Sequence, residues 1–127
     1  MHIQSYRDLL VWQKSMDLCV EIHGAALLFP KHEMFGLSAQ INRAVVSIPS
    51  NIAEGQGRRT TLDFIHFLSI ARGSLNEVET QITLAMRYGY LTSTDHDGLL
   101  ERCFEIGRML NGLIDSLEQR IHSSSLH

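Results

Sequence analysis

The sequence predicts an all-α fold, an antiparallel up-down-up-down four-helix bundle formed by a single domain over residues 1–127. Three observations predict it. Apolar residues recur every three or four positions in four separate stretches, which is the period of an amphipathic helix. The connections between these stretches are short, which favours antiparallel neighbours. Only two prolines occur in the chain, and few stretches alternate apolar and polar residues as a strand would.

The first helix is expected at residues 8–29. Ser5 and Asp8 have the spacing of a capping box at its start. Pro30 ends it, because the residue before a proline avoids the helical region. Its apolar stripe is predicted to place His23 in the core. The stripe consists of Leu9, Trp12, Met16, Cys19, His23 and Leu27.

The second helix is expected at residues 37–54, with Pro49 inside it. A proline removes a backbone donor and clashes with the preceding turn, at a cost of about 3 kcal/mol, so the helix should be kinked or broken there. The freed carbonyl groups need partners, and the local candidates are Ser47, Ser50 and Asn51. Glycines at 55 and 57 should end the helix with a left-handed cap. The apolar stripe is Leu37, Ile41, Val45, Ile48 and Ile52.

The third and fourth helices have the clearest patterns. Thr60 and Asp63 have capping-box spacing before the third helix, which should end at Gly89. Its seam is Phe64, Leu68, Ala71, Leu75, Val78, Ile82 and Ala85. The fourth helix should begin near Thr94, with Asp97 completing a cap. Its stripe is Cys103, Ile106, Leu110, Leu113, Leu117 and Ile121. The ordered part is expected to span about 6–121, with a frayed tail at 122–127.

Composition limits the function classes. The net charge is −3 with a pI near 6.1, so the chain as a whole is not a basic nucleic-acid-binding module. The acidic excess lies in residues 91–127, which leaves the middle of the chain free to present arginines. Cys19 and Cys103 are expected to be reduced thiols. The N-terminus lacks the pattern of a signal peptide, and no run approaches the roughly 18 apolar residues of a membrane span. A cytoplasmic protein without membrane association is therefore expected.

No motif predicts catalysis, a cofactor or a metal site. A di-iron bundle needs Glu-x-x-His sequences on paired helices, and the chain has none. No Walker loop and no Ser/His/Asp arrangement is recognisable. Arg59 and His66, separated by six residues, fit the loose spacing of helical HEPN-type ribonucleases, but a cap at Thr60 would separate them from a common helix. The expectation is a non-enzymatic protein, with such a ribonuclease as a remote alternative.

Four strings carry a specific resemblance: Leu-Val-Trp-Gln-Lys at 10–14, the turn at 29–37, residues 40–55 ending in Ile-Pro-Ser-Asn-Ile-Ala-Glu-Gly, and residues 70–81 with Gly-Ser and Glu-Thr-Gln. They resemble the four-helix-bundle family encoded by intervening sequences of bacterial 23S ribosomal RNA genes, over about residues 6–121. The resemblance implies a bundle that assembles as a ring-like homopentamer. It also implies a relative, the accessory protein of diversity-generating retroelements, which is strongly basic and binds nucleic acid and a reverse transcriptase.

The same strings suggest a polar network between the second and third helices. In an antiparallel pair Arg43 could reach Glu77, and a bidentate arginine–carboxylate pair would fix the register of the helices. The network residues are Arg43, Asn51, Glu54, Glu77 and Glu79. The alternatives are that these charges form a solvated face or hold a ligand. Gly73 lies in mid-helix, where glycine is costly, so a close approach within the bundle or to another subunit is expected there.

Two surfaces are candidates for partners. The third helix has apolar residues outside its seam, Ile65, Phe67 and Ile70, which are candidates for an oligomer interface. Four arginines are candidates for nucleic-acid contacts repeated around an oligomer: Arg58, Arg59, Arg72 and Arg87. The alternative is that isolated arginines only solvate the helices. The sequence thus predicts a self-associating scaffold or adaptor, with RNA or a nucleic-acid-handling protein as the alternative partner.

Overall fold

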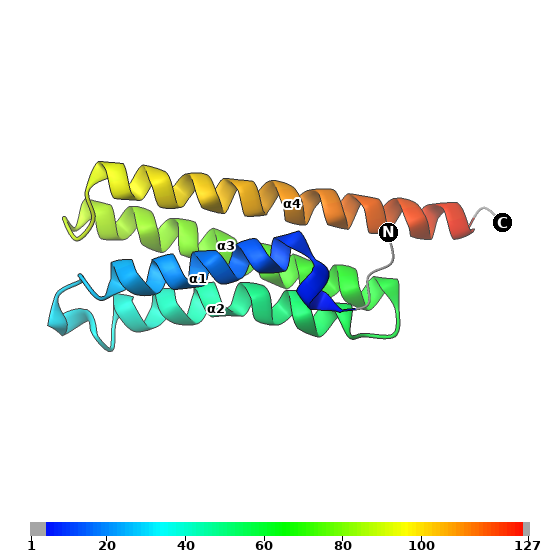
Figure 1. Ribbon diagram of the computed structural model, residues 1–127, viewed down its shortest axis with the longest axis horizontal. Helices are drawn as coiled ribbons and strands as arrows, with labels where there is room; N and C mark the ends of the chain where they lie inside the picture. Colours follow the sequence, from blue (N-terminus) through cyan, green and yellow to red (C-terminus); the bar gives the residue numbers. More distant parts are fainter. Residues whose placement is uncertain (1–4, 126–127) are drawn as a thin grey trace.

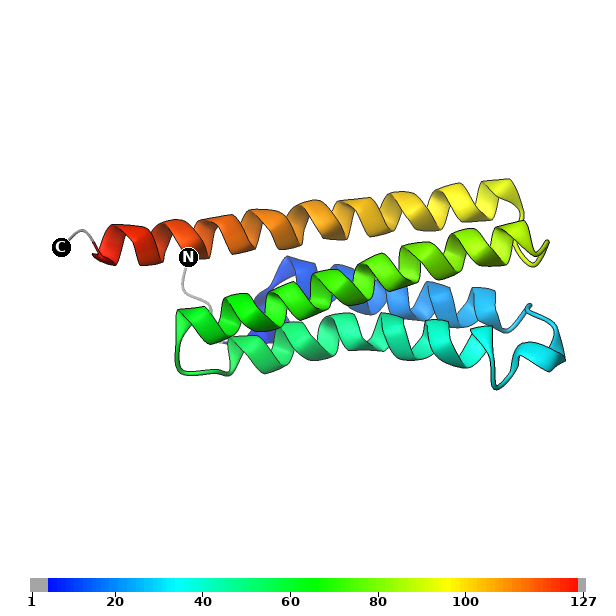
Figure 2. The ribbon, with the colours of Figure 1, turned by 180° about the vertical axis from the view of Figure 1, so that it is seen from behind.

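The computed structural model describes residues 5–125, and these form four long helices with two short 3₁₀ helices and no strand. Successive long helices run in opposite directions, as the colour order in Figures 1 and 2 shows. The all-α, up-down-up-down prediction is therefore confirmed. The elements are η1 (Tyr6–Asp8), α1 (Leu10–Ala26), η2 (Lys31–Glu33), α2 (Leu37–Gln56), α3 (Thr61–Arg87) and α4 (Ser93–Ser125).

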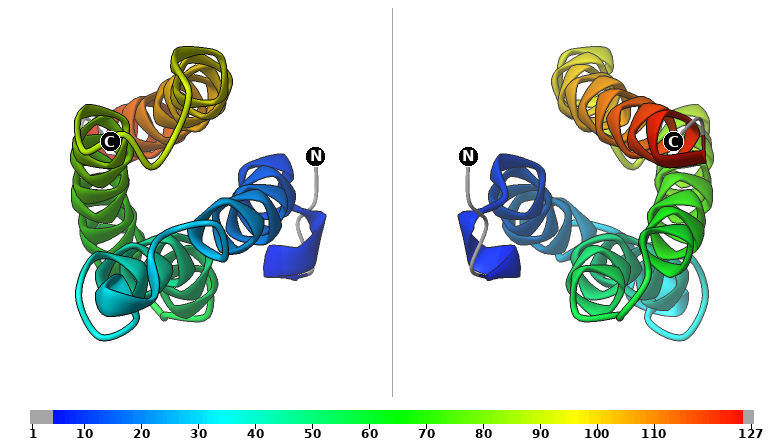
Figure 3. Two further views of the ribbon diagram at one scale, coloured as in Figure 1. Left: turned by 90° about the vertical axis from the view of Figure 1, so that its left-hand side faces the viewer. Right: turned by 90° about the vertical axis from the view of Figure 1, so that its right-hand side faces the viewer.

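The four helices are not equally engaged with one another. The contact between α2 and α3 is the most extensive, whereas α1 and α4 make the smallest contact of the long helices. Viewed along the bundle, α1 and α4 stand apart on the side opposite the α2–α3 pair (Figure 3). At 1.5 Å per residue, the 17 residues of α1 span about 25 Å and the 33 of α4 about 50 Å. The last turns of α4 therefore extend beyond the ends of α2 and α3 (Figure 1).

Three of the four predicted apolar stripes form the core. All five stripe residues of α2 are buried, as are the seam residues of α3 apart from the half-buried Phe64. On α4, Ile114 replaces Leu113 among the buried residues, and Leu113 and Ile121 are half-buried. Deep burial of these aliphatic side chains is the main contribution to the stability of the bundle.

The predicted stripe of α1 was right only in part, since Leu9 is buried and Trp12 and Cys19 are half-buried against the core. The helix buries a face rotated by about one residue, namely Val11, Ser15, Leu18, Ile22 and Ala26. Met16, His23 and Leu27 of the expected stripe are exposed instead. The polar Ser15 hid the correct face from sequence reading, but its hydroxyl donates a 2.7 Å hydrogen bond to the carbonyl of Val11 and can therefore be buried.

Pro49 does not break α2, which continues from Leu37 to Gln56. Proline has no N–H, so the carbonyl of Val45, four residues earlier, loses its helical partner. The thiol of Cys19 on α1 donates to this carbonyl at 3.3 Å. Of the local candidates, Asn51 donates to the carbonyl of Ser47 rather than to that of Val45. The partner of the freed carbonyl therefore comes from another helix.

The helix ends combine expected and unexpected caps. The hydroxyl of Thr60 accepts the N–H of Asp63 at 3.1 Å, as predicted. Thr92 rather than Thr94 caps α4. The left-handed cap expected at residues 55–57 is absent, since Gly57 has a φ of −81°. Gly89, with a φ of 84°, is in the left-handed region, and it ends α3.

Two further boundaries differ from expectation. Ser5 accepts the N–H of Arg7 and so caps η1, while α1 begins only at Leu10. The fourth helix does not fray at residue 122, because α4 continues to Ser125. Residues 126–127 of the expected tail lie outside the described residues.

Candidate functional site

The polar network between α2 and α3 is built from hydroxyl and amide groups. The hydroxyls of Ser47 and Ser74 lie 2.9 Å apart, and the amide of Asn51 donates to the Ser47 hydroxyl at 2.9 Å. Ser74 is buried, so the pairing satisfies a polar group in the core. Asn51 thus belongs to the network as expected, whereas Ser74 was known from sequence only as the neighbour of a mid-helix glycine.

The charged members of the expected network do not join it. The Arg43–Glu77 pair is not formed, because both side chains are exposed and they make no ion pair with each other. Glu79 is half-buried, and burial raises its pKa. Glu54 forms an ion pair at 2.7 Å with Arg58, one turn later on the exposed surface. The antiparallel arrangement placed Arg43 and Glu77 on neighbouring helices. The sequence could not show which way each side chain points.

The close approach of α2 and α3 occurs at Gly55, not at Gly73. A Cβ atom added to Gly55 would lie 2.7 Å from the Cβ of Phe67 and 3.0 Å from Cδ1 of Phe64. Gly73 has open space around it. The expectation of close packing at Gly73 within the bundle is therefore wrong, and a contact there with another subunit stays a prediction.

A threonine, a histidine and an aspartate meet between α3 and α4. The hydroxyl of Thr83 lies 3.1 Å from Nε2 of His96, whose Nδ1 lies 2.8 Å from Oδ1 of Asp97. The order resembles that of a nucleophile–histidine–carboxylate relay. However, Thr83 lies inside α3, and the N–H of His96 itself is bonded to the carbonyl of Thr92 at 2.9 Å, so the backbone N–H of neither residue is free to stabilise an oxyanion. The trio serves to satisfy the buried His96 and to join the two helices.

A second polar cluster joins the two connections at one end of the bundle. The Tyr90 hydroxyl donates a 2.8 Å hydrogen bond to Oε2 of Glu33, and Oε1 of Glu33 accepts the N–H of Leu37 at the start of α2. The hydrogen bonds from Leu37 and from Tyr90 lower the pKa of Glu33, and the bond to Glu33 raises the pKa of Tyr90. Glu33 therefore anchors the α1–α2 connection to the α3–α4 turn. The sequence held no signal for this contact.

The candidate arginines lie apart. Arg58 and Arg59 follow α2, and the guanidinium of Arg58 stacks on the ring of Phe67 at 4.7 Å. Arg72 donates to Asn111 of α4 at 2.9 Å. Arg87 is exposed at the opposite end of α3. The four residues therefore do not form one patch.

Arg58 and Arg59 instead share a cavity with an arginine that sequence reasoning missed. This cavity has a volume of about 360 Å³ and lies between the α2–α3 turn and the C-terminal part of α4. Arg120 of α4 lines it together with Arg58 and Arg59. We refer to it as the arginine cavity. It is lined by Gln56, Arg58, Arg59, Thr60, Thr61, Phe64, Leu113, Ser116, Leu117 and Arg120.

Exposed apolar side chains are most numerous on α1 and the connection after it. Seven of the thirteen large apolar side chains that are exposed among the described residues come from α1 and the connection after it: Leu10, Met16, Val20, Leu27, Leu28, Met34 and Phe35. We refer to these seven as the α1 apolar surface. Of the predicted interface residues, Ile70 is 39% exposed, whereas Ile65 and Phe67 are half-buried within the chain.

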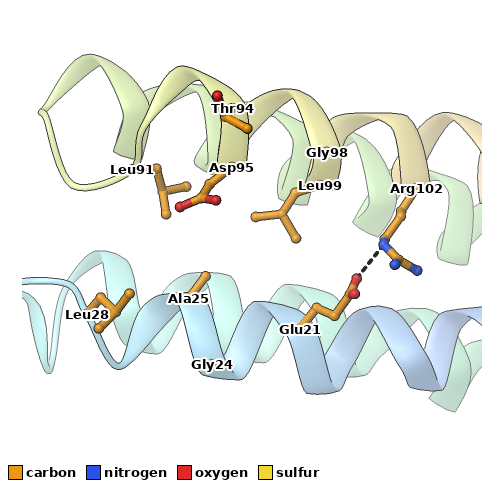
Figure 4. A pocket seen from close by; sticks show the side chains of 10 residues that line it. All are labelled: Glu21, Gly24, Ala25, Leu28, Leu91, Thr94, Asp95, Gly98, Leu99 and Arg102. Atoms are coloured by element: carbon orange, nitrogen blue, oxygen red, sulfur yellow. Dashed lines mark ion pairs between the residues drawn. The ribbon is translucent and has the colours of Figure 1, made fainter.

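A groove of about 390 Å³ separates α1 from α4 beside this surface (Figure 4). Ala25 lines it from α1 and Leu28 from the turn that follows α1, while Leu99 lines it from α4 and Leu91 lies just before α4. Glu21 and Arg102 form an ion pair of 2.7 Å across the groove (Figure 4). Toward the α3–α4 turn the groove is lined by leucines together with Thr94 and Asp95, and toward the middle of the helices it is bridged by the ion pair.

The described residues contain no group of three or more His, Cys, Asp or Glu side chains placed to hold a metal ion. None of the helices in residues 5–125 is long and apolar enough to cross a membrane. Both cysteines are free thiols. Burial raises the pKa of Cys19 to about 11 and that of Cys103 to about 12, so both stay protonated near neutral pH.

Comparison with known proteins points to one family. No curated protein matches the chain. The chain is similar to a crystal structure from Bacteroides thetaiotaomicron, described as a protein with unknown function from the S23 ribosomal protein family. The two are 30% identical with a TM-score of 0.78, over 84% of this chain and 96% of that one. The model of the 23S rRNA-intervening sequence protein family matches residues 7–112. The chain therefore belongs to the 23S rRNA-intervening sequence protein family.

Proposed function

We propose that this chain is a non-enzymatic helical scaffold that assembles with copies of itself, as a homopentamer, in the cytoplasm. The observation that supports it most is the α1 apolar surface. Leu28 is 74% exposed and Phe35 is 92% exposed. Burying one such side chain is worth about 1.5–3 kcal/mol, so an assembly that covers several of them would be stabilised.

The groove between α1 and α4 supplies a complementary surface. It shares Leu28 with the α1 apolar surface, and the rest of its lining belongs to other residues, so it has room for apolar side chains from a neighbouring copy. Contact between two different patches, the α1 apolar surface of one copy and the groove of the next, is a heterologous interface. Such interfaces generate closed rings when the rotation between subunits closes.

The test is an interface variant with a matched control. Leu28→Glu places a charge in the groove-side part of the α1 apolar surface, and Leu62→Glu places the same charge at a 67% exposed leucine on α3. We expect Leu28→Glu to lower the mass measured by size-exclusion chromatography with light scattering, and Leu62→Glu to leave it unchanged. Equal masses for both variants and the parent chain would refute this interface.

A second function, RNA binding, is favoured by the convergence of Arg58 and Arg59 with Arg120 in one cavity. Self-association would repeat the arginines around a ring and strengthen phosphate contacts. Binding to a labelled single-stranded RNA across a salt series tests it, because affinity for phosphates falls steeply as salt rises. No binding at low salt would eliminate this function.

A further inference from the structure

The arginine cavity stands out because of the charges that line it. The whole chain carries 14 acidic and 11 basic residues, yet the ten residues of this lining include three arginines and no carboxylate. Arg58 already has an acidic partner in Glu54. Arg59 and Arg120 make no ion pair with any described residue. Two guanidinium groups without an acidic partner thus line one cavity, Arg59 from the α2–α3 turn and Arg120 from α4.

The remaining lining is suited to a larger ligand than an inorganic anion. Thr61 and Ser116 add hydroxyl groups near the arginines, and Gln56 adds an amide. Phe64, Leu113 and Leu117 form an apolar wall beside them. A volume of about 360 Å³ falls within the range of about 300–1,000 Å³ that is typical of small-molecule sites. A bare phosphate ion would leave the apolar wall unused.

The acidic groups around the cavity do not neutralise it. Asp115 and Glu118 lie on α4 near Arg120, but they line a separate depression together with Gln119, His122 and Ser123. On α3 the backbone N–H of Asp63 is bound by Thr60, and its carboxylate is not part of the lining. The electrostatic field inside the cavity is therefore set by the arginines, which bind phosphate through a planar array of donors.

We propose that the arginine cavity binds a nucleotide, with the phosphate held by Arg59 and Arg120 and the base against Phe64 and Leu113. Arg58 supports the site by its charge while it stays paired with Glu54. The inference gives a ligand class to the RNA-binding function proposed above. It does not depend on self-association, because all the lining residues belong to one chain.

The experiment titrates the full chain with AMP, adenosine and inorganic phosphate, and follows backbone amide signals of residues 60–64 and 116–120 by NMR. We expect saturable shifts with AMP, at least tenfold weaker binding of phosphate, and no saturation with adenosine. Adenosine binding as tight as AMP would overturn the role of the arginines. Phosphate binding as tight as AMP would overturn the assignment of a nucleotide.

Variants localise the site. Arg120→Gln should weaken AMP binding at least tenfold, while Arg108→Gln, at an exposed position of α4 outside the lining, should change it less than twofold. Equal effects of the two variants would overturn the proposal. Circular dichroism and light scattering serve as controls for whether both variants keep the fold and mass of the parent. AMP binding without RNA binding would leave the nucleotide site standing and reject the RNA function alone.

Discussion

The hydrogen bond from Cys19 to the Val45 carbonyl gives the sharpest stability prediction. Cys19→Ala removes the donor that compensates for the N–H missing at Pro49. Val45 is fully buried, so its carbonyl would have no replacement partner. A lost hydrogen bond costs about 0.5–1.5 kcal/mol and an unpaired buried carbonyl about 1–3 kcal/mol. Because a thiol is a weak donor, we expect a loss of about 1–2 kcal/mol in the free energy of unfolding.

A double-mutant cycle separates this contact from simple packing. Pro49→Ala restores an N–H that can bond to the Val45 carbonyl, so Cys19→Ala should cost only about 0.5 kcal/mol in that background. Cys19→Ser is the matched control, since it also loses the sulfur but keeps a donor. Unfolding is measured in urea by circular dichroism at one fixed protein concentration, because self-association makes stability depend on concentration. Equal costs of Cys19→Ala in both backgrounds would refute the reasoning.

Three further predictions follow from other contacts. Gly55→Ala should destabilise the chain by about 1–3 kcal/mol in urea unfolding, because the added Cβ has no room between α2 and α3. Gly73→Ala, at a helical position with open space around it, should stabilise the chain by about 0.5–1 kcal/mol. The pKa of Glu33 in the folded chain is below its ordinary value of 4.5. The contribution of Glu33 to the free energy of unfolding is therefore complete above pH 4.5 and is lost as pH falls through the lowered pKa. Glu33→Gln should flatten this part of the pH–stability profile. The pKa values of Cys19 and Cys103 are raised from 9.0 to about 11 and about 12, so at pH 8 a thiol reagent should react more slowly in the folded chain than in urea, by about 100-fold at Cys19 and about 1,000-fold at Cys103. Equal rates in the folded chain and in urea would contradict the burial of these thiols.

The fold was largely predictable because three helices carry an uninterrupted apolar period. In α3, residues such as Leu68, Leu75 and Ile82 recur at heptad spacing and are all fully or almost fully buried. In α1 the buried face contains Ser15, a polar residue that interrupts its apolar period. Periodicity alone cannot show that the Ser15 hydroxyl is satisfied by its own helix. The cost of Pro49 was predictable from the sequence. The donor to the freed Val45 carbonyl is Cys19, which lies 26 residues earlier in the chain, so local reasoning could not find it.

The candidate sites were less predictable, because they depend on which residues of different helices converge. Arg58 and Arg59 were identified as basic residues near a turn, but Arg120 is 61 residues further along the chain and lies in its most acidic segment. The α2–α3 pairing placed Arg43 and Glu77 on neighbouring helices, while the side chains themselves point to solvent. Such contacts depend on how each helix is rotated about its own axis. The sequence indicates this rotation only through the position of the apolar face.

The central claim is that the α1 apolar surface and the α1–α4 groove bring copies of this chain together. Light scattering of the unmodified chain, coupled to size-exclusion chromatography and repeated over a range of concentrations, tests it most directly. We expect a uniform species with a mass about five times the 14.4 kDa of one chain. A single species of 14.4 kDa at every concentration would contradict it.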